Sequence, residues 1–281
     1  MKLSRNALRN LANRYRAVLK KCRLLNTFGI LLLAGCCVVG VGENVLAYGP
    51  GEASDKNITY TYNSTSGPLP DIVYGGEATG DWGNGAVDAT RNSLIIEGRN
   101  DDVNGIYGGK ADTRYPDSAK RSQALNNNVS IKQSTITVKG NKIGFDQGEI
   151  DISVIGGYAG KEANNNSVNI DSGTFSGVVI GGMATGKNGK AVGNSVNLSG
   201  GILTGGAFND EQIAVVGGYA NAGSLQNNTV QISGTAKVTG NVYAIYCQSS
   251  PDKTATTISG EVIITGQEEH SSPDLSQSSL Y

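Results

Sequence analysis

The sequence predicts an all-β fold: a parallel β-solenoid (β-helix) of about five to six irregular coils, preceded by an N-terminal signal or anchor helix. Three observations support this prediction. A pair of apolar residues followed by Gly-Gly recurs along the chain. An Asn-rich turn that leads into alternating apolar residues recurs between those pairs. The 281 residues include 40 Gly but only one Trp and four Phe, so the composition suits strands and turns better than a wide core.

The first segment, residues 1–47, is typical of an export signal. It contains eight Lys or Arg residues and one acidic residue, Glu43, and the basic part is followed by the uncharged, mostly apolar run Phe28–Val41. Fourteen residues make a short membrane span, whereas a signal peptide needs no more. We therefore expect export and cleavage between Ala47 and Tyr48, with an uncleaved N-terminal anchor as the alternative.

Lipid attachment is a second way of processing this segment. The order Leu33-Ala34-Gly35-Cys36 resembles the bacterial lipobox, which makes Cys36 a possible lipidation site. The apolar run continues beyond Cys36, which favours the cut at Ala47. Because three of the four cysteines lie in the leader, the exported chain keeps only Cys247, and neither an intrachain disulfide nor a cysteine zinc site is expected.

The remaining residues divide into a lead-in, a repeat region and a tail. Residues 48–71 are polar and rich in Gly and Pro, with one strand predicted at Ile58–Tyr62 as part of an N-terminal cap. Residues 72–266 contain the repeats, and residues 267–281 form a disordered polar tail. From residue 48 onward, 23 acidic residues outnumber 15 basic ones, so nucleic acid is not expected as a partner.

Each repeat has two landmarks. The first glycines of the Gly-Gly pairs lie at 75, 108, 156, 181 and 217, and Val242-Tyr-Ala-Ile245 stands where a sixth pair would be. The turns precede four alternating segments: Asn128-Val-Ser-Ile131, Ser167-Val-Asn-Ile170, Ser195-Val-Asn-Leu198 and Thr229-Val-Gln-Ile232. Period-2 alternation predicts that Val168 and Ile170 point inward. We expect Gly at bends with positive φ, and stacked Asn amides bonded in ladders.

These repeats resemble the passenger repeats of bacterial autotransporter (type V secreted) adhesins. The resemblance rests on Val154-Ile-Gly-Gly-Tyr-Ala-Gly160, Asn166-Ser-Val-Asn-Ile-Asp-Ser-Gly-Thr-Phe175 and Asn227-Asn-Thr-Val-Gln-Ile-Ser-Gly234, and it covers roughly residues 72–266. It implies a surface-exposed β-helical stalk, carried in that family by a C-terminal outer-membrane barrel. The ten-residue alternating segments of such a barrel are missing from this sequence.

The expected function is therefore that of an exported, non-catalytic scaffold at the cell surface or outside the cell of a Gram-negative bacterium. It would mediate adhesion by binding host or neighbouring-cell proteins or glycans, anchored in the membrane through its N-terminal segment or self-associating through its solenoid ends. No catalytic residue, metal site or cofactor is expected: the only histidine, His270, lies in the polar tail.

The alternative is a polysaccharide-binding or polysaccharide-degrading β-helix. It would use the carboxylates Asp146, Glu149 and Asp151, gathered in one groove with a basic partner such as Lys142. Asp101-Asp102 are a second, adjacent pair of carboxylates, and such groups could bind calcium or serve as a general acid and base.

Overall fold

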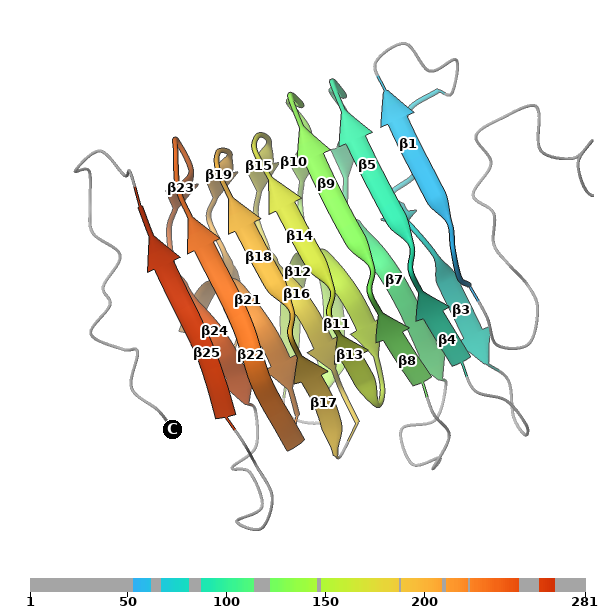
Figure 1. Cartoon of the computed structure of the whole chain (residues 1–281). Coiled ribbons are helices and arrows are strands. Elements are labelled where there is room, and N and C mark those ends of the chain that lie inside the picture. The colour runs from blue at the N-terminus through green and yellow to red at the C-terminus, as the bar shows by residue number, and fades with distance from the viewer. Residues whose placement is uncertain are drawn as a thin grey trace, which may run out of the picture. The chain divides into compact units, whose positions relative to one another are not determined.

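The computed structural model describes part of the chain, and that part is entirely β. The described residues are 53–61, 67–80, 87–113, 122–145, 148–186, 188–208, 211–221, 223–247 and 258–265. They contain no helix, and long parallel strands run in curled sheets, as expected of a β-solenoid (Figure 1). The chain divides into two units, Met1–Glu43 and Asn44–Tyr281, and all described residues belong to the second. The predicted N-terminal helix lies outside the described residues.

Three sheets make up this unit, and we name them A, B and C. Sheet A has 11 strands: β1 (Asn57–Thr61), β4 (Val87–Thr90), β5 (Ser93–Glu97), β8 (Ser122–Leu125), β9 (Asn128–Lys132), β13 (Glu162–Asn164), β14 (Ser167–Ile170), β17 (Gly189–Val192), β18 (Ser195–Leu198), β22 (Gly223–Ile232) and β25 (Ile258–Ile264). Sheet C has five short strands: β6 (Asp102–Val103), β10 (Thr137–Val138), β15 (Thr174–Phe175), β19 (Ile202–Leu203) and β23 (Lys237–Val238). Sheet B has nine strands: β2 (Ile72–Tyr74), β3 (Glu77–Gly80), β7 (Gly105–Thr113), β11 (Asn141–Phe145), β12 (Gly148–Ala159), β16 (Val178–Ala184), β20 (Gly206–Phe208), β21 (Glu211–Ala220) and β24 (Asn241–Cys247).

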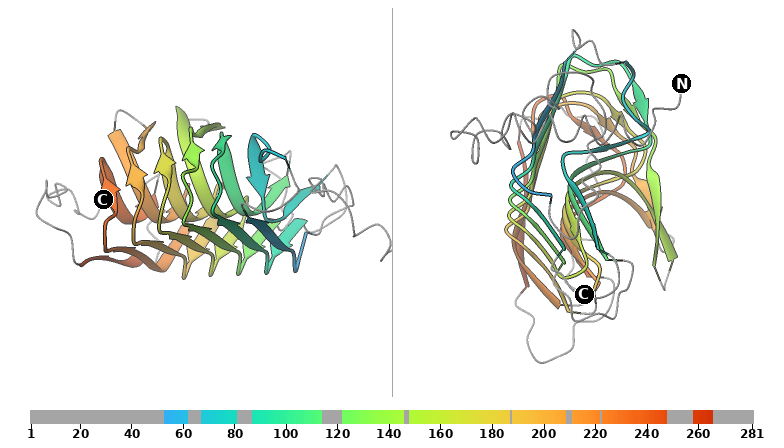
Figure 2. Two further views of the ribbon diagram at one scale, coloured as in Figure 1. Left: turned by 90° about the horizontal axis from the view of Figure 1, so that it is seen from above. Right: turned by 90° about the vertical axis from the view of Figure 1, so that its right-hand side faces the viewer.

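The chain passes through sheets A, C and B in turn and then returns to sheet A one strand further along (Figure 2). Equivalent residues of successive repeats are therefore paired in register, as Val168 is with Val129 and Val196. The predicted alternation is confirmed, because Val168 and Ile170 are buried while Asn169 between them is half-buried. The strand predicted at Ile58–Tyr62 corresponds to β1, which pairs with β5.

A ladder of buried asparagine side chains runs through sheet A, as the Asn-rich turns predict. Its members are Asn92, Asn127, Asn166, Asn194 and Asn228. The Nδ2 of each of the first four donates to the Oδ1 of the next asparagine at 2.8–3.0 Å. The same Oδ1 also accepts the backbone N–H of the preceding member, so the ladder bonds both side chain and main chain.

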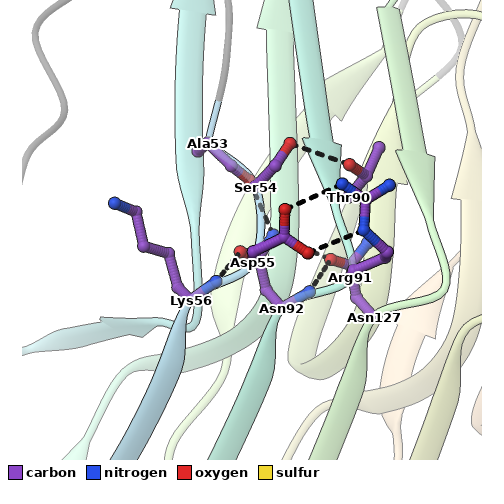
Figure 3. A network of polar contacts seen from close by, with 8 residues as sticks. All are labelled: Ala53, Ser54, Asp55, Lys56, Thr90, Arg91, Asn92 and Asn127. Atoms are coloured by element: carbon purple, nitrogen blue, oxygen red, sulfur yellow. Dashed lines mark hydrogen bonds and ion pairs between the residues drawn. The ribbon is translucent and has the colours of Figure 1, made fainter.

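The residue before each ladder asparagine has a left-handed backbone. Arg91, Asn126, Asn165 and Asn227 have φ of 53–57°, and the fifth position is Gly193 with φ of 67°. Figure 3 shows the N-terminal end of this row, where Arg91 binds Asp55 at 2.6 and 2.8 Å. The turn thus directs each asparagine side chain into the interior, where its amide is fully bonded.

The Gly-Gly pairs have a different role from the one predicted. None of the glycines in the five pairs has a left-handed φ, so positive φ at a bend does not explain them. They are needed because backbones approach closely. A Cβ on Gly75 would meet the carbonyl oxygen of Gly108 in the next repeat, and a Cβ on Gly109 would lie 2.5 Å from Cγ of Asn127. Sheet B can therefore lie against the asparagine ladder only where it has no side chain.

The last repeat reverses this arrangement. Gly217 and Gly218 are followed in register by Ala244 and Ile245 of β24, so the glycine pair is replaced there. In sheet A, Gly260 pairs with Asn228, at the position where the ladder would continue. In this repeat the glycine, Gly260, lies in sheet A and the side chains, those of Ala244 and Ile245, lie in sheet B. The space between the two sheets is therefore filled from sheet B, whereas in the other repeats an asparagine of sheet A fills it.

Candidate functional site

The outer face of sheet B carries a second apolar cluster, separate from the main core between the sheets. The inward residues Ile106, Val154, Val179 and Val215 belong to the main core. The outward residues form the second cluster: Tyr107, Ile155, Ile180, Met183, Val216 and Tyr219 are at most 2% exposed. A sheet face that is exposed to water is normally polar. An apolar outer face is therefore expected to be covered by other parts of the chain or to contact a partner.

Two β-hairpins cover the middle of that face. The first is made by β11 and the start of β12, and the second by β20 and the start of β21. Both β12 and β21 also pair in parallel with the next strand of sheet B, and these pairings shift register at Ile152/Val154 and at Ile213/Val215. In Figure 2 the β11–β12 hairpin bends away from the stacked strands as a separate flap. The hairpins contribute Ile143, Ile150, Ile152, Phe208 and Ile213 to the apolar cluster.

Two groups of tyrosines lie toward the two ends of the same face. We name Tyr74, Tyr107 and Tyr158, from the consecutive strands β2, β7 and β12, the N-terminal tyrosine cluster. The rings of Tyr74 and Tyr107 have centroids 5.2 Å apart, and Tyr107 meets Tyr158 edge-on at 6.4 Å. Tyr74 and Tyr158 are half-buried, whereas Tyr107 is buried behind them.

Charged groups surround the N-terminal tyrosine cluster. The ammonium of Lys110 lies 5.4 Å from the centre of the Tyr74 ring, within the range of a cation–π contact. It also lies 3.0 Å from Glu77 Oε1 and 3.5 Å from Asp112 Oδ2. The side chains of Lys110, Glu77 and Asp112 are 20%, 13% and 40% exposed, so Asp112 is the most open to solvent.

We name Phe208, Tyr219, Tyr243 and Tyr246 the C-terminal tyrosine cluster. Tyr246 is stacked on Tyr219 at 5.8 Å, and Tyr243 meets Tyr246 at 5.4 Å. Phe208 of the second hairpin meets both Tyr219 and Tyr246 edge-on. The hydroxyl of Tyr243 donates to Glu211 Oε2 at 3.0 Å and accepts from Asn241 Nδ2 at 3.2 Å.

Burial shifts the titration of these phenols. Loss of hydration raises the pKa of Tyr158 to about 12, and the nearby carboxylate of Asp112 acts in the same direction. Partial burial, together with the hydrogen bond to Glu211, raises the pKa of Tyr243 to about 12 as well. The pKa of Lys110 is also raised, because Tyr74, Glu77 and Asp112 outweigh the opposing effect of burial. At neutral pH the face therefore carries neutral phenols, one ammonium ion and carboxylates.

The predicted carboxylate site lies on the exposed side of the first hairpin. Lys142 pairs in register with Asp151, and Lys142 Nζ lies 3.4 Å from Glu149 Oε2. The side chains of Lys142 and Glu149 are 68% and 63% exposed, so both charges remain in water. Asp146 lies outside the described residues. Lys142, Glu149 and Asp151 do come together, but on a solvated strand face and not in a groove.

The second acidic candidate, Asp101-Asp102, separates into two different ion pairs. Asp101 Oδ2 accepts from Arg99 Nε at 2.7 Å, with both side chains about one-tenth exposed. Arg99 also donates to the carbonyl oxygens of Thr61 and Gly67, which fixes the first repeat at the corner between sheets A and C. Asp102 forms an exposed pair with Lys139 at 3.2 Å.

The remaining predicted residues divide between described and undescribed parts. Cys247 is half-buried at the end of β24 and packs against the apolar cluster around Leu225. The possible lipidation site Cys36, the cleavage site Ala47–Tyr48 and His270 all lie outside the described residues. Within the described ranges, no three His, Cys, Asp or Glu side chains are grouped as metal ligands, and no helix is long and apolar enough to cross a membrane.

The tyrosine clusters were not predicted, although the sequence carries a signal for them. Tyrosine stands immediately before Gly-Gly at Tyr74 and Tyr107, immediately after it at Tyr158 and Tyr219, and again in Val242-Tyr-Ala-Ile-Tyr246. In the structure only the first residue of each apolar pair points into the main core, and the second points outward.

Comparison with known proteins gives no match: no family model, curated protein or solved structure is similar to this chain.

Proposed function

We propose that this protein is an exported bacterial surface protein with a non-catalytic, passenger-like scaffold that mediates adhesion. The scaffold is a parallel β-solenoid of about five to six coils, and the leader directs it to the surface of a Gram-negative cell. The resemblance of the repeats to autotransporter adhesins supports the proposal, as does the regular stacking of repeats whose recurring Gly-Gly and Asn residues have structural roles.

The observation that carries the proposal is the pair of tyrosine clusters on the outer face of sheet B. Tyr74, Tyr158, Tyr243 and Tyr246 are half-buried on a surface that a purely structural solenoid would keep polar. Tyrosine offers a rigid apolar ring with a polar end, and it is enriched where proteins contact their partners. We therefore assign adhesion to this face.

The test is to express the full chain in a Gram-negative host and to measure attachment of the cells to cultured epithelial cells and to one another. We expect more attachment than with the empty vector, and less with Tyr74→Ala or Tyr243→Ala. Thr59→Ala and Thr239→Ala are matched controls, because both threonines are exposed and neither lies on a strand of sheet B. Attachment no greater than that of the empty vector, with the protein detected at the surface, would contradict the proposal.

Processing of the leader is tested by mass spectrometry of the exported chain. A mature chain that begins at Tyr48 supports cleavage after Ala47. A lipid-modified chain that begins at Cys36 and is lost in Cys36→Ala would establish the lipoprotein alternative. An intact leader in the membrane fraction would indicate the uncleaved anchor.

Polysaccharide degradation has less support from the geometry. A glycosidase needs two carboxyl groups that face one glycosidic bond. Glu149 is instead an exposed partner of Lys142. Polymer cleavage that is abolished by both Glu149→Gln and Asp151→Asn would reinstate this alternative.

A further inference from the structure

We infer that the N-terminal tyrosine cluster, together with Glu77, Lys110 and Asp112, is a binding site for an uncharged glycan. This inference rests on the proposed function and gives one ligand class to the adhesive face. A sugar ring has one apolar C–H face and a rim of hydroxyl groups. A site for it needs aromatic rings beside polar side chains that both donate and accept hydrogen bonds.

The aromatic part of the site is built and held rigid. Tyr74 and Tyr158 are half-buried, and each contacts the buried ring of Tyr107, which lies between them in the sheet order. The hydroxyl of Tyr107 accepts from Asn141 Nδ2 at 3.1 Å, so the first hairpin fixes the central ring. Rings that are already ordered lose little entropy when a ligand binds.

The polar part consists of charged groups from the two neighbouring strands β3 and β7. Lys110 is held between Glu77 Oε1 and Asp112 Oδ2, and its three N–H bonds can serve a ligand hydroxyl as well as the carboxylates. Asp112 is 40% exposed, and its carboxylate can accept from sugar hydroxyls. Donor and acceptor thus lie beside the same pair of half-buried rings.

Charge selects among glycans. Two carboxylates and one ammonium give the site a net charge of about −1, and Asp112 is the more exposed of its two acids. A uronic-acid or sulfated polymer would be repelled by this charge, whereas an uncharged glycan would not. Nucleic acid is disfavoured for the same reason.

A protein partner is the competing occupant, and the test must separate the two. Affinity electrophoresis of the full mature protein is run in gels that contain a soluble β-glucan, a mannan, a galactan or chitin oligosaccharides, with polygalacturonate as the acidic comparison. We expect at least one uncharged glycan to retard the protein, and polygalacturonate to retard it less.

Three variants locate the binding. Tyr74→Ala should weaken the affinity about fivefold to tenfold because the stacking ring is lost, and Tyr74→Phe should stay within about twofold. Asp112→Asn should weaken binding of the uncharged glycan and reduce the discrimination against polygalacturonate. Thr59→Ala, on the exposed face of sheet A, is the control and should bind as the parent does. Circular dichroism and the unfolding midpoint of each variant exclude misfolding as the cause.

The inference is overturned if none of the four uncharged glycans binds, if polygalacturonate binds best, or if Tyr74→Ala and Thr59→Ala behave alike. Cells that attach through Tyr74 in the absence of any glycan binding would overturn it in favour of a protein partner, while the proposed adhesive function would stand. If the protein binds a glycan but confers no attachment on cells, the glycan-binding inference would stand and the proposed adhesive function would be contradicted.

Discussion

The amide of Asn127 lies directly against the backbone of Gly109: a methyl group on Gly109 would come within 2.5 Å of Asn127 Cγ. The same contact recurs in every repeat that has both a ladder asparagine and a Gly-Gly pair. The side chain of each ladder asparagine therefore has two structural roles. It bonds the turn of sheet A along the solenoid, and it fills the space that glycine leaves in sheet B.

Gly109→Ala should destabilise the protein by about 1–3 kcal/mol, because an added methyl group has no space beside a bonded amide. The free energy of unfolding is measured by chemical denaturation. Gly144→Ala is the matched control: a Cβ there meets nothing within 4 Å, and the residue has no left-handed φ. Equal midpoints for the two variants would contradict the close-approach explanation.

Asn194→Ala should cost about 3 kcal/mol because it interrupts the ladder in the middle. The backbone N–H and the Nδ2 of Asn166 both lose Asn194 Oδ1 as acceptor, and the carbonyl of Ala163 loses a donor. Asn197→Ala, which removes a half-buried side chain on the outer surface, should cost less than about 1 kcal/mol. Hydrogen exchange should show the largest loss of protection at Asn166. Unchanged protection at Asn166 would mean that its backbone N–H does not depend on the hydrogen bond to Asn194 Oδ1.

Arg99→Ala should destabilise the protein by about 3–5 kcal/mol, since it leaves the largely buried carboxylate of Asp101 without its cationic partner, and the hydrogen bond from the Leu69 N–H at 3.3 Å does not supply a charge. The control is Lys139→Ala, which breaks the exposed pair with Asp102 and should cost at most about 1 kcal/mol. Thermal unfolding of both variants distinguishes the two kinds of ion pair. A small effect of Arg99→Ala would show that the corner of the first repeat is held by packing alone.

The exchange of side chains in the last repeat predicts energetic coupling. Gly260→Asn alone should be destabilising, because a Cβ there would lie 2.7 Å from Ala244 Cβ and 3.1 Å from Ile245 Cγ2. Adding Ala244→Gly and Ile245→Gly should recover part of the loss, with a coupling energy of about 1 kcal/mol or more. Additive effects across this cycle would contradict the exchange.

Alkaline pH should unfold the protein through its buried phenols. The pKa of Tyr158 is raised from 10.0 to about 12 in the folded state, so its contribution to stability is complete below pH 10 and is lost as the pH rises toward 12. Absorbance of phenolate at 295 nm should show this tyrosine titrating late, as Tyr243 does, and Tyr158→Phe should reduce the late component by one phenol. Titration of all tyrosines near pH 10 in the folded protein would contradict its burial.

The repeat pattern alone was sufficient to predict parallel strands stacked in register and the asparagine ladders, because alternation and turn residues act locally. Val168, Ile170 and the Asn-rich turns behave as their local patterns predict. Gly-Gly was also interpreted from its local pattern, as a bend, and that prediction was wrong. Glycine is required at these positions because residues of sheet A come into close contact with the backbone of sheet B.

The sequence by itself determined the strand content, which residues of the alternating segments point inward, and that the asparagine side chains stack in a ladder along the sheet. Only the tertiary structure decided that sheet B has a second apolar face, that two hairpins cover its middle, and that tyrosines from β2, β7 and β12 gather beside Lys110. The physical reason is distance along the chain. Period-2 alternation says which side of a strand a residue occupies, but the neighbours it finds there come from other coils, more than 30 residues away between Tyr74 and Tyr107.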